Sequence, residues 1–523
     1  MTTAVPREAI INGNDLTSLG AHDLAQLLAR GEASALEATE QYIARIEAVN
    51  PQLNAVVAKR YDQARAEARA VDARRSRGEA PGALAGVPVT IKECIDVAGL
   101  PSTFGLAWRK DLRAEADEAH VARLKAAGAV IVGKTNVAQL LAYIESDNPV
   151  YGRTNNPWNL ERVCGGSSGG EGSIIAAGGS PLGFGTDIGG SVRCPAAFCG
   201  TAAMKPTAGR CDDPGLYSFH VGERAIVSQI GVLARNVEDV ALGLDVINGG
   251  PQVGDWRKVD VSRLRVGFYV EDGIFRTAPS IRRSVREAAQ AVKDAGAQVL
   301  EWQPHDTARA FRLVYGLLGG DGLKWFREVL RGGPVHPSVK TMLAIAGKPR
   351  GFLKVVSGVL NAVGQKTLAQ VIPLFARSNV YDHWKLVAEQ MEYRARFAEA
   401  MDRADGGPLD LIVGPVCALP AFRHGTTKDL GVAGANTILY NVLGYPAGVV
   451  PWSRVGVDEE SDRPASGDIV EKLAKKCEEG SAGLPVAVQV AARPWREHAA
   501  FAAMRVIENA ARKRGDYPVK PVL

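Results

Sequence analysis

Long apolar runs and cysteine pairs are both missing from this chain of 523 residues. No uninterrupted apolar stretch reaches the roughly 18 residues of a membrane-spanning helix, and the first residues lack the apolar run of a signal peptide. Seven cysteines are an odd number with no Cys-x-x-Cys pair, which argues against a disulfide framework or a structural zinc site. We therefore expect a cytoplasmic protein that holds no metal and needs no cofactor.

Acidic side chains are absent from residues 329–381, which carry seven Lys or Arg residues. The net charge of the whole chain is only +5, so the rest of the chain is slightly acidic. The overall positive charge is therefore no sign of nucleic-acid binding, and we expect no nucleic-acid partner.

Short apolar runs alternate with helical patterns after residue 82, which is typical of an α/β protein with helices packed on a central sheet. Strands are expected at 87–91, 129–132, 264–270, 409–413 and 485–490, and helices at 120–127 and 284–295. Before them, Ser34-Ala-Leu-Glu37 predicts a capped helix that stops near Asn50-Pro51.

No obvious linker divides the chain, so we expect one domain at 16–515 between an N-terminal tail (1–15) and a C-terminal tail (516–523). Within that domain, residues 453–482 are polar and are expected to form an exposed excursion with a short helix.

A serine preceded by two glycines, Ser191, is the candidate nucleophile. A serine hydroxyl needs a base to take its proton. Glycine accepts backbone angles that other residues resist, so the N–H groups of Ile188, Gly189, Gly190 and Ser191 could converge as an oxyanion hole.

The candidate base is Lys92, at the end of the strand expected at 87–91. Its ordinary pKa of about 10.4 would have to fall by roughly three units before the amine could accept a proton at neutral pH, and apolar surroundings act in that direction. Ser167, in the loop Gly165-Gly-Ser-Ser-Gly-Gly, would relay the proton between Ser191 and Lys92. Ser168 would stabilise that loop.

Asp187 and Arg193 flank the candidate nucleophile. They could form an ion pair that fixes the position of Ser191, and a solvent-exposed surface pair is the alternative that the sequence leaves open.

The segments 165–172, 185–193 and 198–207 closely resemble the signature block of the amidase signature family. The spacing agrees as well, with 75 residues from Lys92 to Ser167 and 24 more to Ser191. The chain is most similar to the fatty acid amide hydrolase branch. The motifs that support this branch are Ser146-Asp-Asn-Pro with Asn156-Pro-Trp, Leu439-Tyr-Asn with Pro446-Ala-Gly-Val-Val-Pro, and Gly483-Leu-Pro-Val-Ala-Val-Gln.

The resemblance implies a single α/β/α domain with a central mixed β-sheet flanked by helices. It also implies a Ser-Ser-Lys triad in which Ser191 is acylated, Ser167 sits on a cis peptide and Lys92 is the base. The expected function is hydrolysis of small-molecule amides, together with some esters, whose acyl group is apolar and aliphatic or aryl.

Residues 329–381 occupy the place where the similar branch has membrane-binding helices over its substrate entrance. Phe352, Val356, Val359 and Val363 fall on one helical face of this basic segment. We expect it to cover an apolar acyl channel. Its outer face is open to three interpretations, which are packing on its own domain, pairing in a homodimer, and peripheral contact with a membrane.

Two other functions fit parts of the sequence. The first is the amidase component of an amidotransferase, which passes ammonia to a partner protein; Cys194 weakens it, because such amidotransferase components usually have glutamine there. The second is an α/β-hydrolase whose nucleophile elbow is Gly165-x-Ser167-x-Gly169. That elbow requires a catalytic histidine and a preceding strand, and 159–164 is a poor candidate for one.

The run Gly128-Ala-Val-Ile-Val-Gly-Lys-Thr matches a phosphate-loop pattern. Its middle residues are typical of a strand rather than a loop, so we do not expect nucleotide binding.

Overall fold

The computed structural model describes residues 15–211, 223–248, 250 and 252–521 of the chain. An 11-stranded sheet runs through these residues. Its strands, in order across the sheet, are β1 (Val56–Lys59), β3 (Val130–Thr135), β2 (Pro88–Lys92), β8 (Leu182–Asp187), β10 (Gln229–Ala234), β9 (Ala202–Lys205), β14 (Ala447–Arg454), β15 (Pro485–Ala492), β13 (Leu411–Pro415), β11 (Arg265–Phe268) and β12 (Gln298–Glu301). Strand β2 pairs in parallel with β3 and β8, whereas β10 is antiparallel to β8, so the sheet is mixed.

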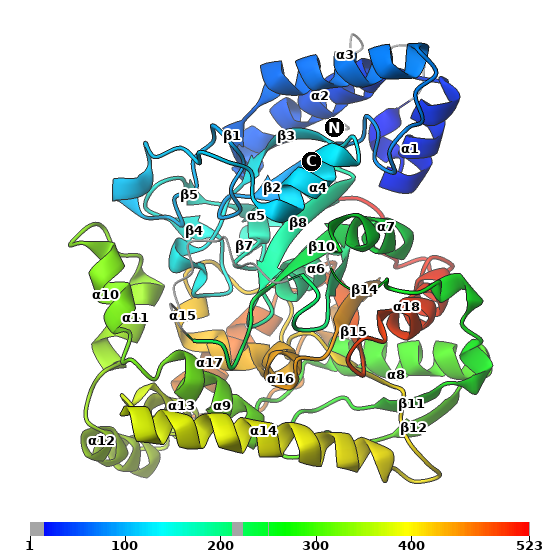
Figure 1. The fold of residues 1–523 in the computed structure, drawn as a ribbon. Helices are drawn as coiled ribbons and strands as arrows, with labels where there is room; N and C mark the ends of the chain where they lie inside the picture. The colour runs from blue at the N-terminus through cyan, green and yellow to red at the C-terminus, as the bar shows by residue number, and fades with distance from the viewer. Residues whose placement is uncertain (1–14, 212–222, 249, 251, 522–523) are drawn as a thin grey trace.

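Helices cover both faces of this sheet (Figure 1). The helices α4 (Ala119–Ala126), α7 (Val237–Ile247), α8 (Pro279–Asp294) and α18 (Glu497–Ala511) contribute to one hydrophobic cluster. The helices α5 (Gly169–Ala176), α6 (Arg193–Cys199), α9 (Thr307–Leu318) and α16 (Ala435–Leu443) contribute to the other. The fold is therefore α/β with a central mixed sheet between helical layers.

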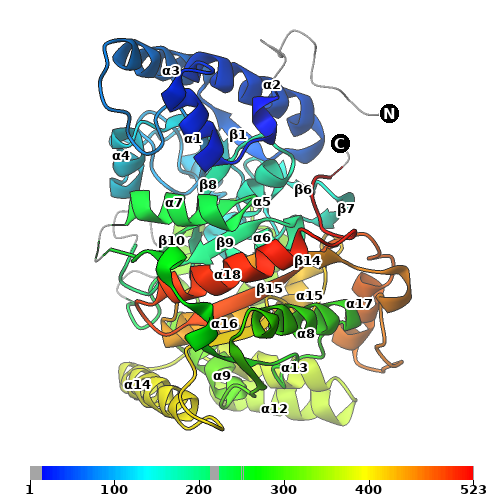
Figure 2. The same ribbon diagram turned by 90° about the vertical axis from the view of Figure 1, so that its right-hand side faces the viewer.

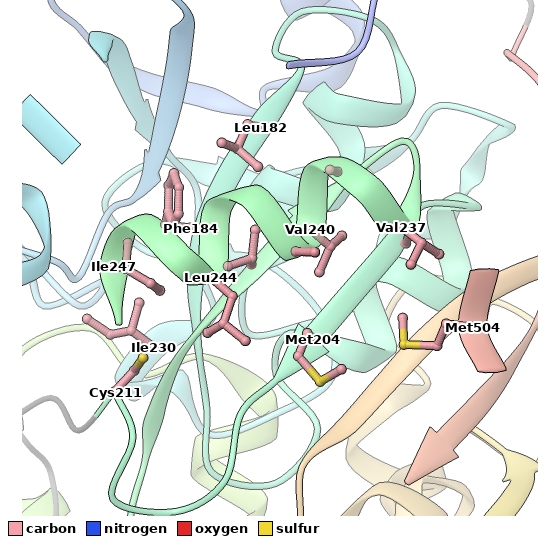
Figure 3. Packing of buried hydrophobic residues seen from close by; sticks show 14 of the residues in the cluster. Leu182, Phe184, Met204, Cys211, Ile230, Val237, Val240, Leu244, Ile247 and Met504 are labelled. Carbon is pink, nitrogen blue, oxygen red and sulfur yellow. The ribbon is translucent and has the colours of Figure 1, made fainter. Parts of the chain in front are cut away.

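The strands divide their side chains between the two clusters because successive residues of a strand point to opposite faces. In β3, Ile131 belongs to the first cluster, and Val130 and Val132 belong to the second. Figure 3 shows the first cluster from close by, where Val240 and Leu244 of α7 lie over the strand that carries Phe184.

The helices α1 (Ala21–Arg30), α2 (Ala35–Leu53) and α3 (Tyr61–Ser76) lie at one end of the molecule, and residues 324–402 lie at the other (Figures 1 and 2). The second group comprises α10 (Lys324–Leu330), α11 (Pro337–Ile345), α12 (Arg350–Ala362), α13 (Lys366–Val371), a 3-10 helix η7 (Ile372–Phe375) and α14 (Val380–Asp402). None of the helices in the described ranges is long and apolar enough to cross a membrane.

The strands and helices expected from the alternating pattern all form, with ends that shift by a few residues. The segment of the phosphate-loop pattern is strand β3, entered from α4, as its middle residues predicted. The polar excursion contains the short helix α17 (Ile469–Glu478).

The helix α2 ends at Leu53, close to the stop predicted near Asn50-Pro51. Pro51 has no N–H to donate, so the last turn of α2 lacks one backbone hydrogen bond. The Asn50 side chain then accepts hydrogen bonds from the N–H groups of Ala55 and Val56, both at 2.8 Å, and so closes the end of the helix.

Candidate active site

Lys92 is completely buried at the end of β2. The alternation of the strand puts Val89 and Ile91 in the first hydrophobic cluster, so Lys92 points to the opposite face, toward α5. Its Nζ lies 2.8 Å from Ser167 Oγ, 2.8 Å from Thr186 Oγ1 and 3.3 Å from the carbonyl oxygen of Thr186. The sequence analysis did not single out Thr186, although it stands inside the matched motif, directly before Asp187.

Ser167 stands in a tight loop between β7 (Asn159–Val163) and α5. The Gly166–Ser167 peptide bond is cis. A Cβ atom on Gly166 would lie only 2.5 Å from the backbone of Tyr143 and Glu145, so this position has room for glycine alone. The loop therefore brings Ser167 Oγ close to Lys92 by packing its backbone directly against a neighbouring segment.

Ser191 lies in the turn between β8 and α6, where it is partly exposed to a cavity. The backbone N–H of Ser168 donates to the carbonyl oxygen of Ser191 at 3.1 Å, and Ser168 Oγ donates to the carbonyl oxygen of Thr186 at 3.4 Å. Ser168 thus ties the two serine loops together. Among the described residues, no hydrogen bond joins the hydroxyls of Ser167 and Ser191.

Asp187 and Arg193 form an ion pair whose two side chains are both fully buried, which rules out the surface pair. Burial alone would raise the pKa of Asp187, but the charge and hydrogen bonds of Arg193, together with Lys205 and Asn441, hold it well below its usual range. Arg193 also donates to three further acceptors from α16 and β15, namely Thr437 O, Asn441 Oδ1 and Gln489 Oε1. The pair therefore connects the nucleophile loop to the other half of the sheet.

The same carboxylate organises the backbone before Ser191. Asp187 Oδ1 accepts a hydrogen bond from the N–H of Gly190 at 2.8 Å, and Oδ2 accepts one from Val192 at 3.2 Å. The Gly190 N–H is thus already engaged, which leaves it poorly placed to bind an oxyanion. In the described part of the chain, the N–H groups of Ile188, Gly189 and Ser191 donate to no protein atom, and these three residues line the cavity.

Glu171 is a buried carboxyl group that the sequence analysis quoted in the motif but gave no role. It lies in the first turn of α5, and its two oxygens accept hydrogen bonds from Thr90 Oγ1 at 2.6 Å and Thr135 Oγ1 at 2.7 Å. Burial raises the pKa of Glu171 to about 8, although the two threonine hydroxyls and Lys92 act in the opposite direction. Glu171 therefore links the helix that follows Ser167 to the strand that carries Lys92.

A cavity of about 270 Å³ opens at Ser191. Most of its wall is apolar and comes from segments far apart in the sequence. Residues 329–381 contribute through α11, α13 and η7; the lining residues of this segment are Thr341, Met342, Ile345, Thr367, Leu368, Val371, Ile372 and Phe375. The segment thus covers an apolar cavity at the candidate nucleophile.

Two findings argue against the α/β-hydrolase alternative with its nucleophile elbow at Ser167. Residues 159–163 do form a strand, β7, contrary to our expectation, but it pairs with β6 (Asn155–Asn156) in a small ribbon outside the main sheet, with one further bridge from Arg162 to Arg423. Seven of the eight histidines lie in the described residues, and none of them hydrogen-bonds to Ser167 or Ser191; His220 lies outside those residues. The partner of Ser167 is a lysine.

A second Ser–Lys contact exists, between Lys134 Nζ and Ser102 Oγ at 2.7 Å. Burial lowers the pKa of Lys134 to about 8. Both residues are buried, and neither lines the cavity at Ser191. Within the described ranges, no group of His, Cys, Asp and Glu side chains is arranged to hold a metal ion.

Sequence and structure comparisons with known proteins agree with each other on the family of this chain. The sequence model of the Amidase family matches residues 37–501. A fatty-acid amide hydrolase 1 from Sus scrofa is 34% identical over 510 residues, covering 94% of this chain and 86% of the relative. A component of the glutamyl-tRNA(Gln) amidotransferase of Roseiflexus castenholzii (strain DSM 13941 / HLO8) is 33% identical over 462 residues, covering 82% and 87%. A solved fatty acid amide hydrolase structure superposes with a TM-score of 0.81 at 23% identity, covering 96% of this chain and 86% of that one.

Proposed function

This chain belongs to the amidase family and hydrolyses carbon–nitrogen amide bonds; we propose that Ser191, Ser167 and Lys92 carry out the reaction. The observation that carries this assignment of roles is the buried contact of 2.8 Å between Lys92 Nζ and Ser167 Oγ. Ser191 stands in a different segment, the turn between β8 and α6, and lines the cavity.

In the proposed first step, Ser191 Oγ attacks the amide carbonyl carbon of the substrate. Its proton passes to Ser167 Oγ, whose own proton passes to Lys92 Nζ. Complete burial disfavours the charged form of a lysine, so the resting side chain acts as a neutral amine. A neutral amine has two N–H groups for the two oxygen atoms of Thr186 and one lone pair for the hydroxyl of Ser167.

The negative charge that develops on the carbonyl oxygen is bound by the N–H groups of Ile188, Gly189 and Ser191. In other enzymes, the loss of one such donor costs about 10²–10³ in rate. The proton then returns from Lys92 through Ser167 to the departing amine, which leaves Ser191 as an ester of the acyl group. Water enters by the same route, and its attack on the ester releases the carboxylic acid and restores Ser191.

Because the cavity at Ser191 is mostly apolar, we expect the substrate to have an acyl group with substantial apolar surface. Such surface contributes about 25 cal/mol for each Å² removed from water. The fatty-acid amide hydrolases among the relatives agree with this choice.

The outer face of α12 supports contact with a lipid surface. Phe352, Val355, Val359 and Val363 are 54–67% exposed, so this face does not pack on its own domain. The sequence predicted Val356 on this apolar face. In the structure Val356 is half-buried, and Val355 lies on the exposed face instead. Residues 329–381 themselves carry only basic charge, which favours an anionic interface. Flotation with anionic vesicles at low salt tests this contact, and full recovery of the protein in the unbound fraction would refute it.

The experiment for the catalytic proposal is labelling with a fluorophosphonate, followed by mass spectrometry of the modified residue. We expect modification of Ser191 and turnover of amides of graded acyl length by the purified chain alone. A component of an amidotransferase, suggested by the relatives of that name, would instead release ammonia from glutamine and respond to a partner protein. Labelling at any other residue would refute the proposed role of Ser191.

A further inference from the structure

Glu171 is a buried carboxyl group to which the proposed reaction gives no part. It stands in the first turn of α5, four residues after Ser167. Gly183 of β8 leaves room for its side chain on the sheet, because a Cβ atom on that glycine would overlap Glu171 Oε2. The two hydrogen bonds that the carboxyl group accepts come from Thr90 of β2 and Thr135 of β3. Glu171 therefore joins the helix that follows Ser167 to two neighbouring strands.

Both threonines are direct neighbours of Lys92. Thr90 precedes Lys92 by two residues on β2, so the two side chains lie on the same face of the strand. Thr135 is the residue of β3 that pairs with Lys92. Glu171 thus holds the surroundings of Lys92 on one side and the helix behind Ser167 on the other. It connects the two elements whose side chains make the contact of 2.8 Å between Lys92 Nζ and Ser167 Oγ.

The surroundings of Glu171 favour its protonated form, in contrast to those of Asp187. Asp187 is equally buried, but the charge and hydrogen bonds of Arg193 hold its pKa well below its usual range. In the described part of the chain, the only hydrogen-bond partners of the Glu171 carboxyl group are the two threonine hydroxyls. A hydroxyl accepts as well as donates, so one threonine can accept the proton of a neutral carboxylic acid while the other donates to its second oxygen. Burial raises the pKa of Glu171 to about 8, so the neutral form prevails at neutral pH.

Lys92 is the charged side chain that acts on the pKa of Glu171, and it lowers that pKa. Other charged side chains on elements packed against α5 are engaged with their own partners; they are Asp187 of β8 with Arg193 of α6, Lys134 of β3 with Ser102, and Arg45 of α2 with the carbonyl oxygen of Ala177. The influence of Lys92 on Glu171 is mutual, because a negative charge on Glu171 favours the ammonium form of Lys92.

We propose that Glu171 is a positioning residue that acts as a neutral carboxylic acid and keeps the proton received by Lys92 mobile. The proposal rests on the proposed roles of Lys92 and Ser167. During acylation Lys92 takes one proton and must return it through Ser167 to the departing amine. A neutral Glu171 adds no negative charge beside the ammonium form, which therefore stays acidic enough to give the proton back. An ionised Glu171 makes Lys92 hold the same proton more tightly.

This role separates amides from esters. An amine leaves only with a proton, whereas the alcohol of an ester leaves far more readily. Tighter retention of the proton by Lys92 therefore slows cleavage of an amide more than cleavage of an ester with the same acyl group. The amide-to-ester ratio of kcat/KM should thus fall as Glu171 ionises above about pH 8. Deprotonation of Lys92 itself affects both substrates and cancels in this ratio.

The test is to measure kcat/KM for an amide and for the methyl ester of the same apolar acid between about pH 6.5 and about pH 9.5. We expect the ratio of the wild type to fall on the order of threefold at the alkaline end. Glu171→Gln cannot ionise, and its ratio should stay constant. Asp239→Asn is the matched control, since it removes another buried carboxyl group whose pKa burial raises, on α7 at the other face of the sheet. It should keep the fall of the wild type.

The positioning role is tested at neutral pH. The side chain of glutamine can make both hydrogen bonds to the threonines, so Glu171→Gln should keep most of the wild-type kcat. Glu171→Leu has a similar size but loses both bonds, and should lower kcat up to about a hundredfold. Its KM should change little, because Glu171 does not line the cavity at Ser191. Thr135→Val removes one of the two bonds and should show a smaller loss of the same kind, which keeps the test decisive if Glu171→Leu does not fold.

Three results would overturn the proposal. They are a constant ratio in the wild type, a ratio that falls equally in Glu171→Gln, and a Glu171→Gln variant as slow as Glu171→Leu. Lys92→Met, measured beside these variants, separates the proposal from the proposed function on which it rests. If Lys92→Met cleaves the amide at the wild-type rate, the role of Lys92 fails and that of Glu171 with it. If Lys92→Met is inactive and Glu171→Gln follows the wild type at every pH, only the role of Glu171 fails.

Discussion

Asp187 accepts a hydrogen bond from the backbone N–H of Gly190 at 2.8 Å while its carboxylate is paired with Arg193. One buried carboxylate thus fixes the backbone that leads to Ser191 and anchors that backbone to Arg193, which in turn reaches α16 and β15. The geometry of the candidate oxyanion hole therefore depends on an ion pair that does not itself touch the substrate.

Replacing Asp187 by alanine should impair both stability and labelling of Ser191. The change leaves Arg193 buried without its counter-charge, which typically costs about 3–5 kcal/mol, and it also frees the Gly190 and Val192 N–H groups. Chemical denaturation and the rate of fluorophosphonate labelling measure the two effects. Asp62→Ala, which breaks an exposed ion pair with Arg65, is the control and should cost less than about 1 kcal/mol. Wild-type behaviour of Asp187→Ala in both measurements would contradict this role.

The two glycines before Ser191 should respond differently to alanine. Gly190 has φ +111°, and a Cβ there would lie 2.3 Å from Thr437 Oγ1, whereas a Cβ on Gly189 would meet nothing within 4 Å. Gly190→Ala should therefore lower the melting temperature and, by displacing the neighbouring N–H groups of Gly189 and Ser191, slow Ser191 labelling by about the hundredfold cost of losing one oxyanion donor, and Gly189→Ala should fold normally. Equal melting temperatures for the two variants would show that the turn does not have this conformation.

Glu171 should make stability depend on pH. Burial raises its folded pKa to about 8 from the ordinary 4.5, so the folded state keeps a proton that the unfolded state has already lost. The contribution of this retained proton to the free energy of unfolding is fully present below about pH 4.5. It is lost as the pH rises toward 8, by an amount on the order of 4 kcal/mol. The isosteric variant Glu171→Gln cannot ionise. We expect its stability relative to the wild type to rise steadily between pH 5 and pH 8, as followed by denaturant titration. A difference that does not change with pH would be incompatible with a buried, protonated Glu171.

Cavity size should limit the acyl group. Val371 lines the cavity, and tryptophan there would fill part of the space, which typically costs about 1–3 kcal/mol when an interior is overpacked. We expect Val371→Trp to lower kcat/KM for long apolar acyl groups about tenfold or more, with a smaller effect on acetyl amides. Val355→Trp, on the exposed face of α12, serves as the control with soluble substrates. An equal decrease in kcat/KM for all acyl lengths would show that the acyl group does not bind in this cavity.

The sequence predicted five of the eleven strands of the sheet, and it paired Lys92 with Ser167, which the structure brings into contact. Strands such as β2 and β15 are mostly apolar because they are buried on both faces. Lys92, Ser167 and Ser191 were predicted from a lysine at the end of such a strand and from two serines in glycine-rich segments, in the order and spacing of the amidase signature.

The remaining features arise from contacts between distant segments. No local pattern shows that Glu171 accepts from Thr90 and Thr135, which precede it by 81 and 36 residues. The commitment of the Gly190 N–H to Asp187 is a matter of side-chain conformation, which residue types do not determine. The cavity wall combines residues from Leu141 to Val470 and becomes recognisable only in the folded chain.

The central claim is that a neutral Lys92 removes the proton of Ser191 through Ser167. The most direct measurement is the pH dependence of the rate at which a fluorophosphonate acylates Ser191, in the wild type and in Lys92→Met. General-base assistance typically contributes about 10²–10⁴ in rate. We predict that the variant, while still folded, reacts slower by that factor and loses the rise in rate that accompanies deprotonation of the amine. A Lys92→Met variant that labels at the wild-type rate with the wild-type pH profile would contradict the account.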